Sequence, residues 1–436
     1  MMLSFFLQYS EQFAGVFSLG HLGRLQLAAA SLATMTATIT GLTIFTGIST
    51  ALDTLCSQAY GSGQRHELGL HLQRCLLLEL VCFVPISVIW LNAETIMLWL
   101  RQDPDLARLC GSFLRFYWWG APGYAIFEAL KRFQQAQNIF HASTYVLLIT
   151  APLNIACNYT FVWSSRFGIG FQGSPIATAM SFNLMALLLA LYVRFVDGYQ
   201  CFGGFSTKAL KDWKPMLKLA GPGIIMICSE WWAVEAMAMA ASYLGTVSLA
   251  AHSIIQTTAN LSFQIPFSAS AVVAARIGNL VGAGRQHSAR ISSTTAIMLG
   301  VGLGLNNSIF LILVRRVWGW LLTNDAETIG VFITVVPILA AFQIADATTI
   351  ITSGILRGLG LQRTGSIISL FSYNVLAIPL ALTFTFVRHW GVVGLWSGML
   401  IAITTAALLQ VVAIGKANYA SIIQDPRDRD LEHSNV

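Results

Sequence analysis

Charged residues are the scarcest class in this sequence. They make up only 10% of its 436 residues, while 56% are hydrophobic and the mean hydropathy is +0.67. Soluble domains carry about 25% charged residues, so the composition excludes a water-soluble protein. A helix needs about 20 apolar residues to cross a bilayer core of about 30 Å. The sequence has room for many such helices, and we expect an all-α polytopic membrane protein.

Several motifs of energy-coupled and metal-dependent proteins are missing. No GxxxxGKS/T pattern occurs, which excludes an ATP-driven pump of the P-loop kind. No HExxH motif or paired CxxC motif points to a metal enzyme, so we expect no metal and no cofactor. The seven cysteines mostly lie within apolar runs and are interpreted as small buried residues. The basic residues are scattered through short loops, which argues against a nucleic-acid partner.

Polar turns divide the chain into about twelve predicted membrane spans. They form two lobes of six, an N-lobe over 1–196 and a C-lobe over 219–415. A polar cytoplasmic linker over 197–218 joins the lobes, and a cytoplasmic tail over 416–436 ends the chain. The predicted spans are 3–19, 25–55, 70–100, 107–136, 142–163, 174–196, 219–243, 248–275, 289–322, 329–357, 364–387 and 392–415.

The two lobes resemble each other in sequence. QAYGSGQ (58–64) aligns with NLVGAGR (279–285) at an offset of 221 residues, and GFQGSPIA (170–177) aligns with GVVGLWSG (391–398) at the same offset. These matches predict an internal duplication. Because each copy has an even number of spans, both enter the membrane from the same side. The lobes should be related by an axis along the membrane normal, with a site between them near the midplane.

The distribution of basic residues predicts the orientation. With the N-terminus in the cytoplasm, 17 of the 25 Lys and Arg residues fall on the inside. This bias predicts that both termini are cytoplasmic. The sequence favours a multi-pass protein of the plasma or vacuolar membrane, and we expect a monomer in the lipid bilayer.

Two acids in the seventh span are the main functional candidates. Glu230 and Glu235 lie in CSEWWAVEAM (228–237), within a segment otherwise apolar enough to span a bilayer. A charged side chain near the bilayer centre costs a few kcal/mol, and such acids normally face a bundle interior or a wet cavity. Five residues place the two about 140° apart around a helix, so both could line one wide cavity. No Lys or Arg lies within ten residues before Glu230 or forty after it.

Other polar and aromatic residues have weaker claims. Trp231 could offer its face to a cation, although packing is the commoner role of an aromatic ring. Gln256 and Asn260 share one face of the eighth span and could hydrogen-bond to a substrate. Glu128 is interpreted as an ion-pair partner of Lys131 and Arg132 on the same helix. The remaining acids are Asp53, expected to stabilise local geometry, Glu79, left undecided, and Glu11, for which a structural role is favoured.

Five motifs together resemble the eukaryotic, fungal-like branch of the multidrug and toxic compound extrusion (MATE) transporters. The resemblance implies twelve helices in two six-helix lobes around a central cavity. It also implies that Glu230 and Glu235 in the seventh helix and Asp346 in the tenth act in exchange of organic cations or metabolites for H⁺ or Na⁺. Relatives begin before this chain does, so a truncated first helix is expected. The motifs are LGRLQLAAASLA (22–33), GISTALDTLCSQAYGSGQ (47–64), KRFQQAQ (131–137), CSEWWAVEAM (228–237) and ITSGILRGLG (351–360).

These observations predict a proton-coupled antiporter, not an enzyme, that exports a cationic or amphipathic organic substrate. Protonation of the C-lobe acids would favour substrate release, and the two lobes would rock around the central cavity. Four alternatives remain: a Na⁺-coupled exporter, a lipid flippase of similar two-lobe fold, an intramembrane enzyme with paired carboxylates, and an inactive truncated remnant.

Overall fold

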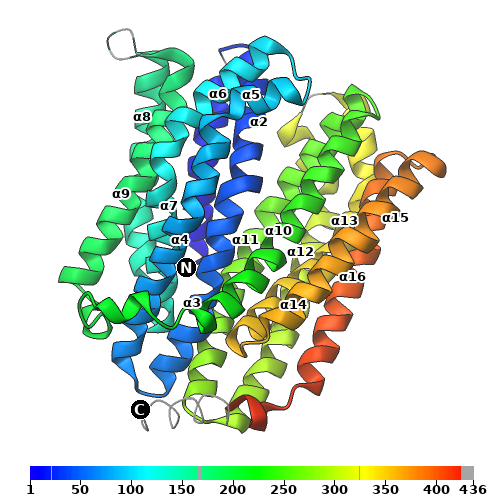
Figure 1. Ribbon diagram of the computed structural model, residues 1–436. Coiled ribbons are helices and arrows are strands. Elements are labelled where there is room, and N and C mark those ends of the chain that lie inside the picture. The colour runs from blue at the N-terminus through cyan, green and yellow to red at the C-terminus, as the bar shows by residue number, and fades with distance from the viewer. Residues whose placement is uncertain (21, 165, 167, 324, 424–436) are drawn as a thin grey trace. The chain divides into compact units, whose positions relative to one another are not determined.

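The fold is described by a computed structural model that covers residues 1–20, 22–164, 166, 168–323 and 325–423. All regular structure in these residues is helical (Figure 1). Ten helical segments among them are long and apolar enough to cross a membrane. The prediction of an all-α polytopic protein is therefore confirmed. The last part of the predicted tail, 424–436, lies outside the described residues.

The helices belong to two compact units. Unit 1 consists of 1–56 and 64–224, and unit 2 of 57–63 and 225–436. The division falls inside two helices, because α3 (Thr43–Gly61) ends in unit 2 and α10 (Lys214–Ser242) begins in unit 1.

Unit 1 contains helices α1 to α9 with several short helical turns. The α1 helix packs on α8, and α9 packs on both α7 and α8. The elements are α1 (Met2–Gly20), α2 (Arg24–Ala37), η1 (Thr38–Leu42), α3, α4 (Arg65–Leu91), α5 (Ala93–Trp99), α6 (Pro104–Tyr117), η2 (Trp118–Gly120), α7 (Ala121–Ala136), α8 (Ala142–Trp163), η3 (Gly170–Gln172), α9 (Gly173–Phe195), η4 (Tyr199–Cys201) and η5 (Thr207–Leu210).

Unit 2 is built around α13, which packs against α11, α12 and α16. Its core contains Phe332, Val335 and Leu339 of α13, all fully buried. The elements after α10 are α11 (Thr246–Gly282), α12 (Gln286–Leu322), α13 (Ala326–Gly358), α14 (Gln362–Ser369), η6 (Leu370–Ala377), α15 (Ile378–Leu382), η7 (Thr383–Val387) and α16 (Val392–Lys416).

Four predicted spans differ from their predicted form. The spans 25–55 and 107–136 are interrupted by the short turns η1 and η2. The predicted span 70–100 is two helices, because α4 ends before Asn92 and α5 follows as a separate short helix. The predicted span 364–387 is a composite in which the wide π-helical turns of η6 and η7 flank α15. Such wide turns place side chains differently from a regular α-helix and are frequent at functional sites.

The duplicated sequence produces a reciprocal backbone contact within unit 2. A Cβ atom built on Gly61 would lie 2.1 Å from the Asn279 carbonyl oxygen, and one built on Gly282 would lie 2.0 Å from the Gln58 carbonyl oxygen. Both glycines and both acceptors are related by the offset of 221 residues. Small residues permit such close helix approach in membranes. The matching of these motifs in sequence therefore has a physical counterpart in the fold.

Candidate functional site

The three predicted acids all lie in unit 2. Glu230 and Glu235 are half-buried on α10, and Asp346 on α13 is only 4% exposed. Glu230 and Asp346 are close enough to interact electrostatically, and the buried hydroxyl of Tyr373 in η6 lies within range of both. None of the three acids forms an ion pair with any described residue. Interacting carboxyl groups respond together to an arriving proton or cation.

The base that acts on Glu230 is anchored elsewhere. Arg357 is buried on α13, eleven residues after Asp346, which is about 16 Å along a helix. Its Nη2 donates a hydrogen bond to the Ser270 hydroxyl at 3.1 Å. Arg357 still exerts an electrostatic effect on Glu230. Glu230 therefore lies within the field of the Arg357 guanidinium as well as that of the Asp346 carboxyl group.

The other predicted site residues lie on α10 and α11. Gln256 donates through Nε2 to Asn260 Oδ1 at 3.0 Å, so these two side chains are oriented by each other. Trp231 is half-buried on α10, next to Glu230 in sequence. Within the described part of the chain, none of these three side chains hydrogen-bonds to the acids. Among the predicted site residues, the structure links Glu230 with Asp346 electrostatically and Gln256 with Asn260 by a hydrogen bond.

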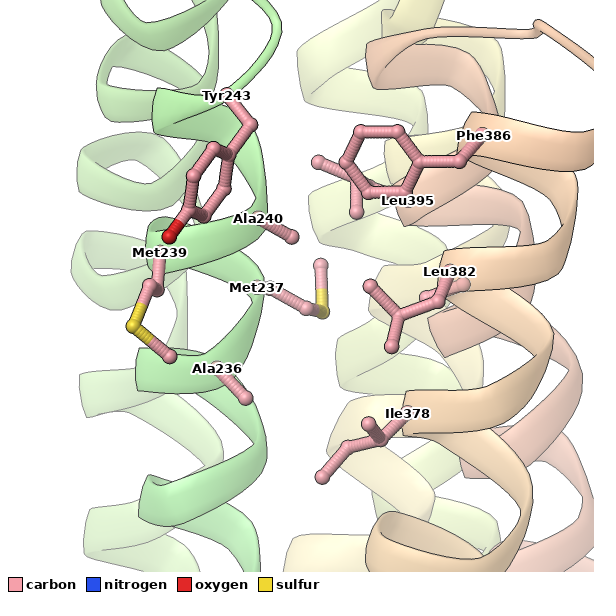
Figure 2. Close-up of a pocket in the computed structure, with 10 residues that line it drawn as sticks. Ala236, Met237, Met239, Ala240, Tyr243, Ile378, Leu382, Phe386 and Leu395 are labelled. Atoms are coloured by element: carbon pink, nitrogen blue, oxygen red, sulfur yellow. The ribbon is translucent and has the colours of Figure 1, made fainter.

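An apolar pocket, which no residue pattern predicted, begins one residue after Glu235. Its volume is about 290 Å³, and it lies between α10 on one side and α15, η7 and the start of α16 on the other. Figure 2 shows Ala236, Met237 and Ala240 facing Ile378 and Leu382 across the gap. The alanines leave the space that larger side chains would fill. The full lining is Ala236, Met237, Met239, Ala240, Tyr243, Ile378, Ala381, Leu382, Phe386 and Leu395.

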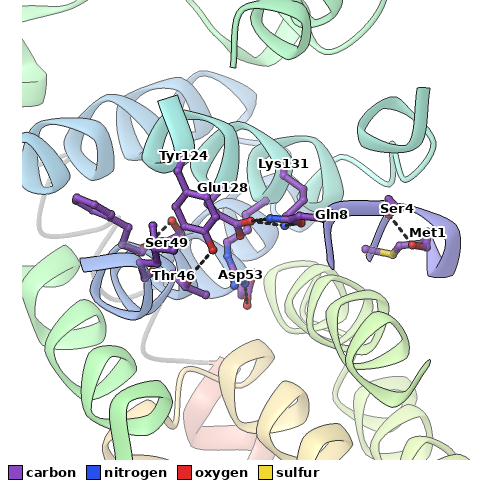
Figure 3. A network of polar contacts seen from close by, with 12 residues as sticks. Met1, Ser4, Gln8, Thr46, Ser49, Asp53, Tyr124, Glu128 and Lys131 are labelled. Atoms are coloured by element: carbon purple, nitrogen blue, oxygen red, sulfur yellow. Dashed lines mark hydrogen bonds and ion pairs between the residues drawn. The ribbon is translucent and has the colours of Figure 1, made fainter. Parts of the chain in front are cut away.

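Unit 1 buries a network of paired charges instead (Figure 3). Lys131 Nζ lies 2.5 Å from Glu128 Oε1, which confirms the predicted ion pair. Arg132, also predicted to pair with Glu128, instead contacts Asp53 Oδ2 at 2.6 Å. Gln8 bridges the first pair, donating to Glu128 at 2.9 Å and accepting from Lys131 at 3.1 Å. These contacts join α1, α3 and α7 and give Asp53 a structural role.

Two further acids of unit 1 are held by hydroxyl groups. Glu79 accepts from the Ser49 hydroxyl at 2.8 Å, and Glu11 accepts from the Thr150 hydroxyl at 2.9 Å. Both acids are almost fully buried, and one oxygen of each has no partner among the described residues. Thr150 also lines a pocket of about 460 Å³ together with Asn154. Glu11, expected to be structural, therefore sits in a polar setting that could bind a proton or a small cation.

The described residues contain no cluster of three or more His, Cys, Asp or Glu side chains that could hold a metal ion. All seven cysteines are free thiols. Five of them are buried as predicted, and Cys82 and Cys157 are only partly buried. The candidate site consists of Glu230, Glu235 and Asp346 together with the apolar pocket that begins after Glu235.

Comparison with known proteins identifies close similarity over nearly the whole chain. The family model MatE matches residues 1–160 and 222–383. An uncharacterized transporter of Schizosaccharomyces pombe is 43% identical over 97% of this chain and 79% of its own length. Multidrug and toxin extrusion protein 1 of Homo sapiens is 33% identical over 96% of this chain and 73% of its own length. The crystal structure of the eukaryotic MATE transporter AtDTX14 superposes with a TM-score of 0.92 at 27% identity, covering 98% and 96% of the two chains.

Proposed function

Because the chain belongs to the MatE family of multi-pass membrane transporters, we propose that it is a secondary active antiporter that exports organic cations in exchange for protons. The observation that carries this proposal is the group of three carboxyl residues in unit 2 without an ion pair to any described residue. Acids in this position can change protonation state, whereas a buried ion pair keeps both charges.

The coupling depends on Glu230, Glu235 and Asp346. In the deprotonated state these acids attract a cationic substrate, and protonation removes that attraction and favours release. Antiport requires this opposition, because substrate and protons must prefer different charge states of the same site. The electrostatic influence of Glu230 on Asp346 supports a shared response of the two groups.

The surroundings of the acids suit a substrate that is both charged and apolar. The pocket after Glu235 offers space for an apolar group, and its only polar lining side chain is Tyr243. Trp231 can place an aromatic face near a cation, an interaction of about 0.5–2 kcal/mol. Gln256 and Asn260 can orient polar substituents. The substrate class is therefore amphipathic organic cations, including metabolites of this character.

The bias of basic residues supports an orientation with both termini in the cytoplasm. In this orientation a monomer in the plasma or vacuolar membrane would export substrate from the cytoplasm, in exchange for protons from the more acidic side.

Transport in sealed proteoliposomes tests the proposal, with ethidium as the probe cation. An imposed pH gradient should drive ethidium exchange by the wild-type protein, and an imposed Na⁺ gradient at equal pH should not. The Glu230→Gln and Glu235→Gln variants should reconstitute normally and lose exchange. Glu94→Gln is the control, because Glu94 forms a surface pair with Arg115 at 3.3 Å. Full pH-driven exchange by both Gln variants would contradict the proposed role of the two acids. Exchange driven by a Na⁺ gradient would show that Na⁺ and not H⁺ is the coupling ion.

A further inference from the structure

The segment that follows α9 carries an exposed set of lysines at the edge of unit 1. Lys208, Lys211, Lys214 and Lys218 are all exposed, and Asp212 is the only acid among them. Residues 205–218 therefore have a net charge of +3. The lysines span η5 and the first turns of α10, so they lie where a membrane-spanning helix begins.

Buried side chains of α4 fix the backbone of this segment. Arg74 is 8% exposed and donates from Nε to the Lys211 carbonyl at 3.1 Å and from Nη2 to the Lys208 carbonyl at 3.5 Å. Gln73 donates to the Gly204 carbonyl at 2.8 Å and accepts from the Ser206 amide at 3.0 Å. The loop backbone therefore has its polar groups satisfied from below, as a segment that keeps a fixed shape requires.

The same segment exposes apolar surface. Phe205 is 91% exposed and meets Phe202 edge-to-face with ring centroids 5.3 Å apart. Leu210 is 65% exposed, while Ala209 beside it is buried against the unit. Exposed aromatic and aliphatic side chains next to lysines are typical of surfaces that lie in the headgroup region of a bilayer.

We propose that Lys208, Lys211, Lys214 and Lys218, here called the lysine platform, bind anionic phospholipid headgroups while Phe205 enters the adjacent apolar layer. A lipid is the expected partner because the segment lies between two membrane-spanning helices. The platform connects the end of one membrane-spanning helix, α9, to the start of another, α10, which places its lysines at headgroup level. None of the four lysines forms an ion pair with a described residue. A lysine near an anionic membrane surface contributes about a fivefold preference for anionic lipid.

The hydrogen bonds from Gln73 and Arg74 to the backbone of this segment, here called the clamp, give the lysine platform a fixed shape. The clamp holds the two carbonyls of Lys208 and Lys211 toward α4, which leaves both side chains on the outer surface of the segment. Because the backbone is already ordered, little conformational freedom is lost when headgroups bind.

The test compares the full-length protein in nanodiscs of phosphatidylcholine alone and of phosphatidylcholine mixed with phosphatidylserine. Thermal unfolding and the mole fraction of phosphatidylserine retained after dilution into detergent are measured. Wild-type protein should unfold at a higher temperature in the mixed lipid and retain phosphatidylserine several-fold above its bulk fraction. Raised salt should weaken both effects, since exposed charges are screened within about 10 Å at 0.1 M.

Two variants separate the platform from general basicity. The quadruple variant Lys208→Gln, Lys211→Gln, Lys214→Gln and Lys218→Gln should lose most of the enrichment and of the stabilisation. A variant with the exposed Arg101, Arg108 and Arg388 changed to Gln should keep both. Gln73→Ala, which loosens the clamp without changing charge, should give an intermediate loss. The proposal is overturned if the quadruple variant behaves like wild type, if the arginine variant loses as much, or if inorganic phosphate in neutral nanodiscs gives the same stabilisation.

Discussion

In unit 1 the carboxylates of Asp53 and Glu128 each form an ion pair with a buried base. In unit 2, by contrast, Glu230 and Asp346 interact electrostatically with each other and form no ion pair with a described residue. A paired carboxylate is held in its charged form and links helices. A carboxyl group without such a partner can gain or lose a proton while the packing around it stays the same. The comparison separates the paired acids Asp53 and Glu128, which link helices, from Glu230 and Asp346, for which we propose proton exchange.

The duplication makes this difference specific. The ends of α7 and α13 are 222 residues apart, and Asn138 and Gly360 follow them with positive φ at the same spacing. Lys131 therefore corresponds to Ser353 and Arg132 to Gly354. The Ser353 hydroxyl donates to Gln410 Oε1 at 3.3 Å, and Gly354 has no side chain. The two bases that form ion pairs in unit 1 thus have uncharged residues at the equivalent places of unit 2.

The largest effect on folding is expected from removing one member of a buried pair in unit 1. Arg132→Met leaves Asp53 buried without its base, which costs about 3–5 kcal/mol. We expect poor recovery of folded protein in size-exclusion chromatography and a strongly lowered unfolding temperature. The double variant Asp53→Asn with Arg132→Met removes the stranded charge and should recover most of the loss. If the single and double variants were equally unstable, the loss would not come from an unpaired buried charge on Asp53.

The next largest loss of stability is expected at the reciprocal contact of Gly61 and Gly282, where the two copies are alike. Gly61→Ala and Gly282→Ala each push a methyl group against a backbone oxygen, so each should destabilise by about 1–3 kcal/mol. The two values should be similar because the contact is reciprocal. Gly330→Ala is the control, since nothing lies within 4 Å of a Cβ added there. Thermal unfolding of all three variants decides the matter, and a control as unstable as the other two would refute the contact argument.

A smaller effect on stability and a large one on transport are expected at Asp346. Asp346→Asn keeps the shape of the side chain and breaks no ion pair with a described residue, so unfolding should shift by less than about 1 kcal/mol. Proton-driven ethidium exchange should nevertheless be lost. An unstable Asp346→Asn variant would indicate that Asp346 has a structural role, as Asp53 does.

The smallest effect concerns an acid outside the membrane. Asp325 accepts hydrogen bonds from the hydroxyl and the backbone amide of Thr328 at the start of α13, and these bonds hold its pKa below the usual range. With the folded pKa lowered, its stabilising effect is fully present above the unfolded pKa and is lost as the pH falls through the folded value. In Asp325→Ala this acid-side loss should disappear, as measured by unfolding between pH 6 and about pH 3.

The sequence predicted the parts of this account that depend on local patterns. The span 142–163 matches α8, and the duplication anticipated the equivalence of Gly61 and Gly282. Contacts between distant residues escaped it. The Asp53–Arg132 pair joins positions 79 residues apart, and no periodicity indicates such a partner.

The pocket beside Glu235 was also invisible in the sequence. Ala236 and Ala240 on α10 read as ordinary helix formers until Ala381 is placed opposite them. The π-helical turns on either side of α15 could not be predicted either. The sequences of η6 (LFSYNVLA) and η7 (TFTFV) contain no pattern that distinguishes a π-helix from an α-helix. Shape that arises where two helices meet cannot be read from either helix alone.

Substrate-driven proton flux through the Glu235→Gln variant tests the central claim most directly. In proteoliposomes with a pH-sensitive dye inside, addition of ethidium should release protons through the wild-type protein and none through Glu235→Gln, while Glu94→Gln should behave as wild type. Proton release by the Glu235→Gln variant at the wild-type rate, with folded protein in the vesicles, would contradict the account.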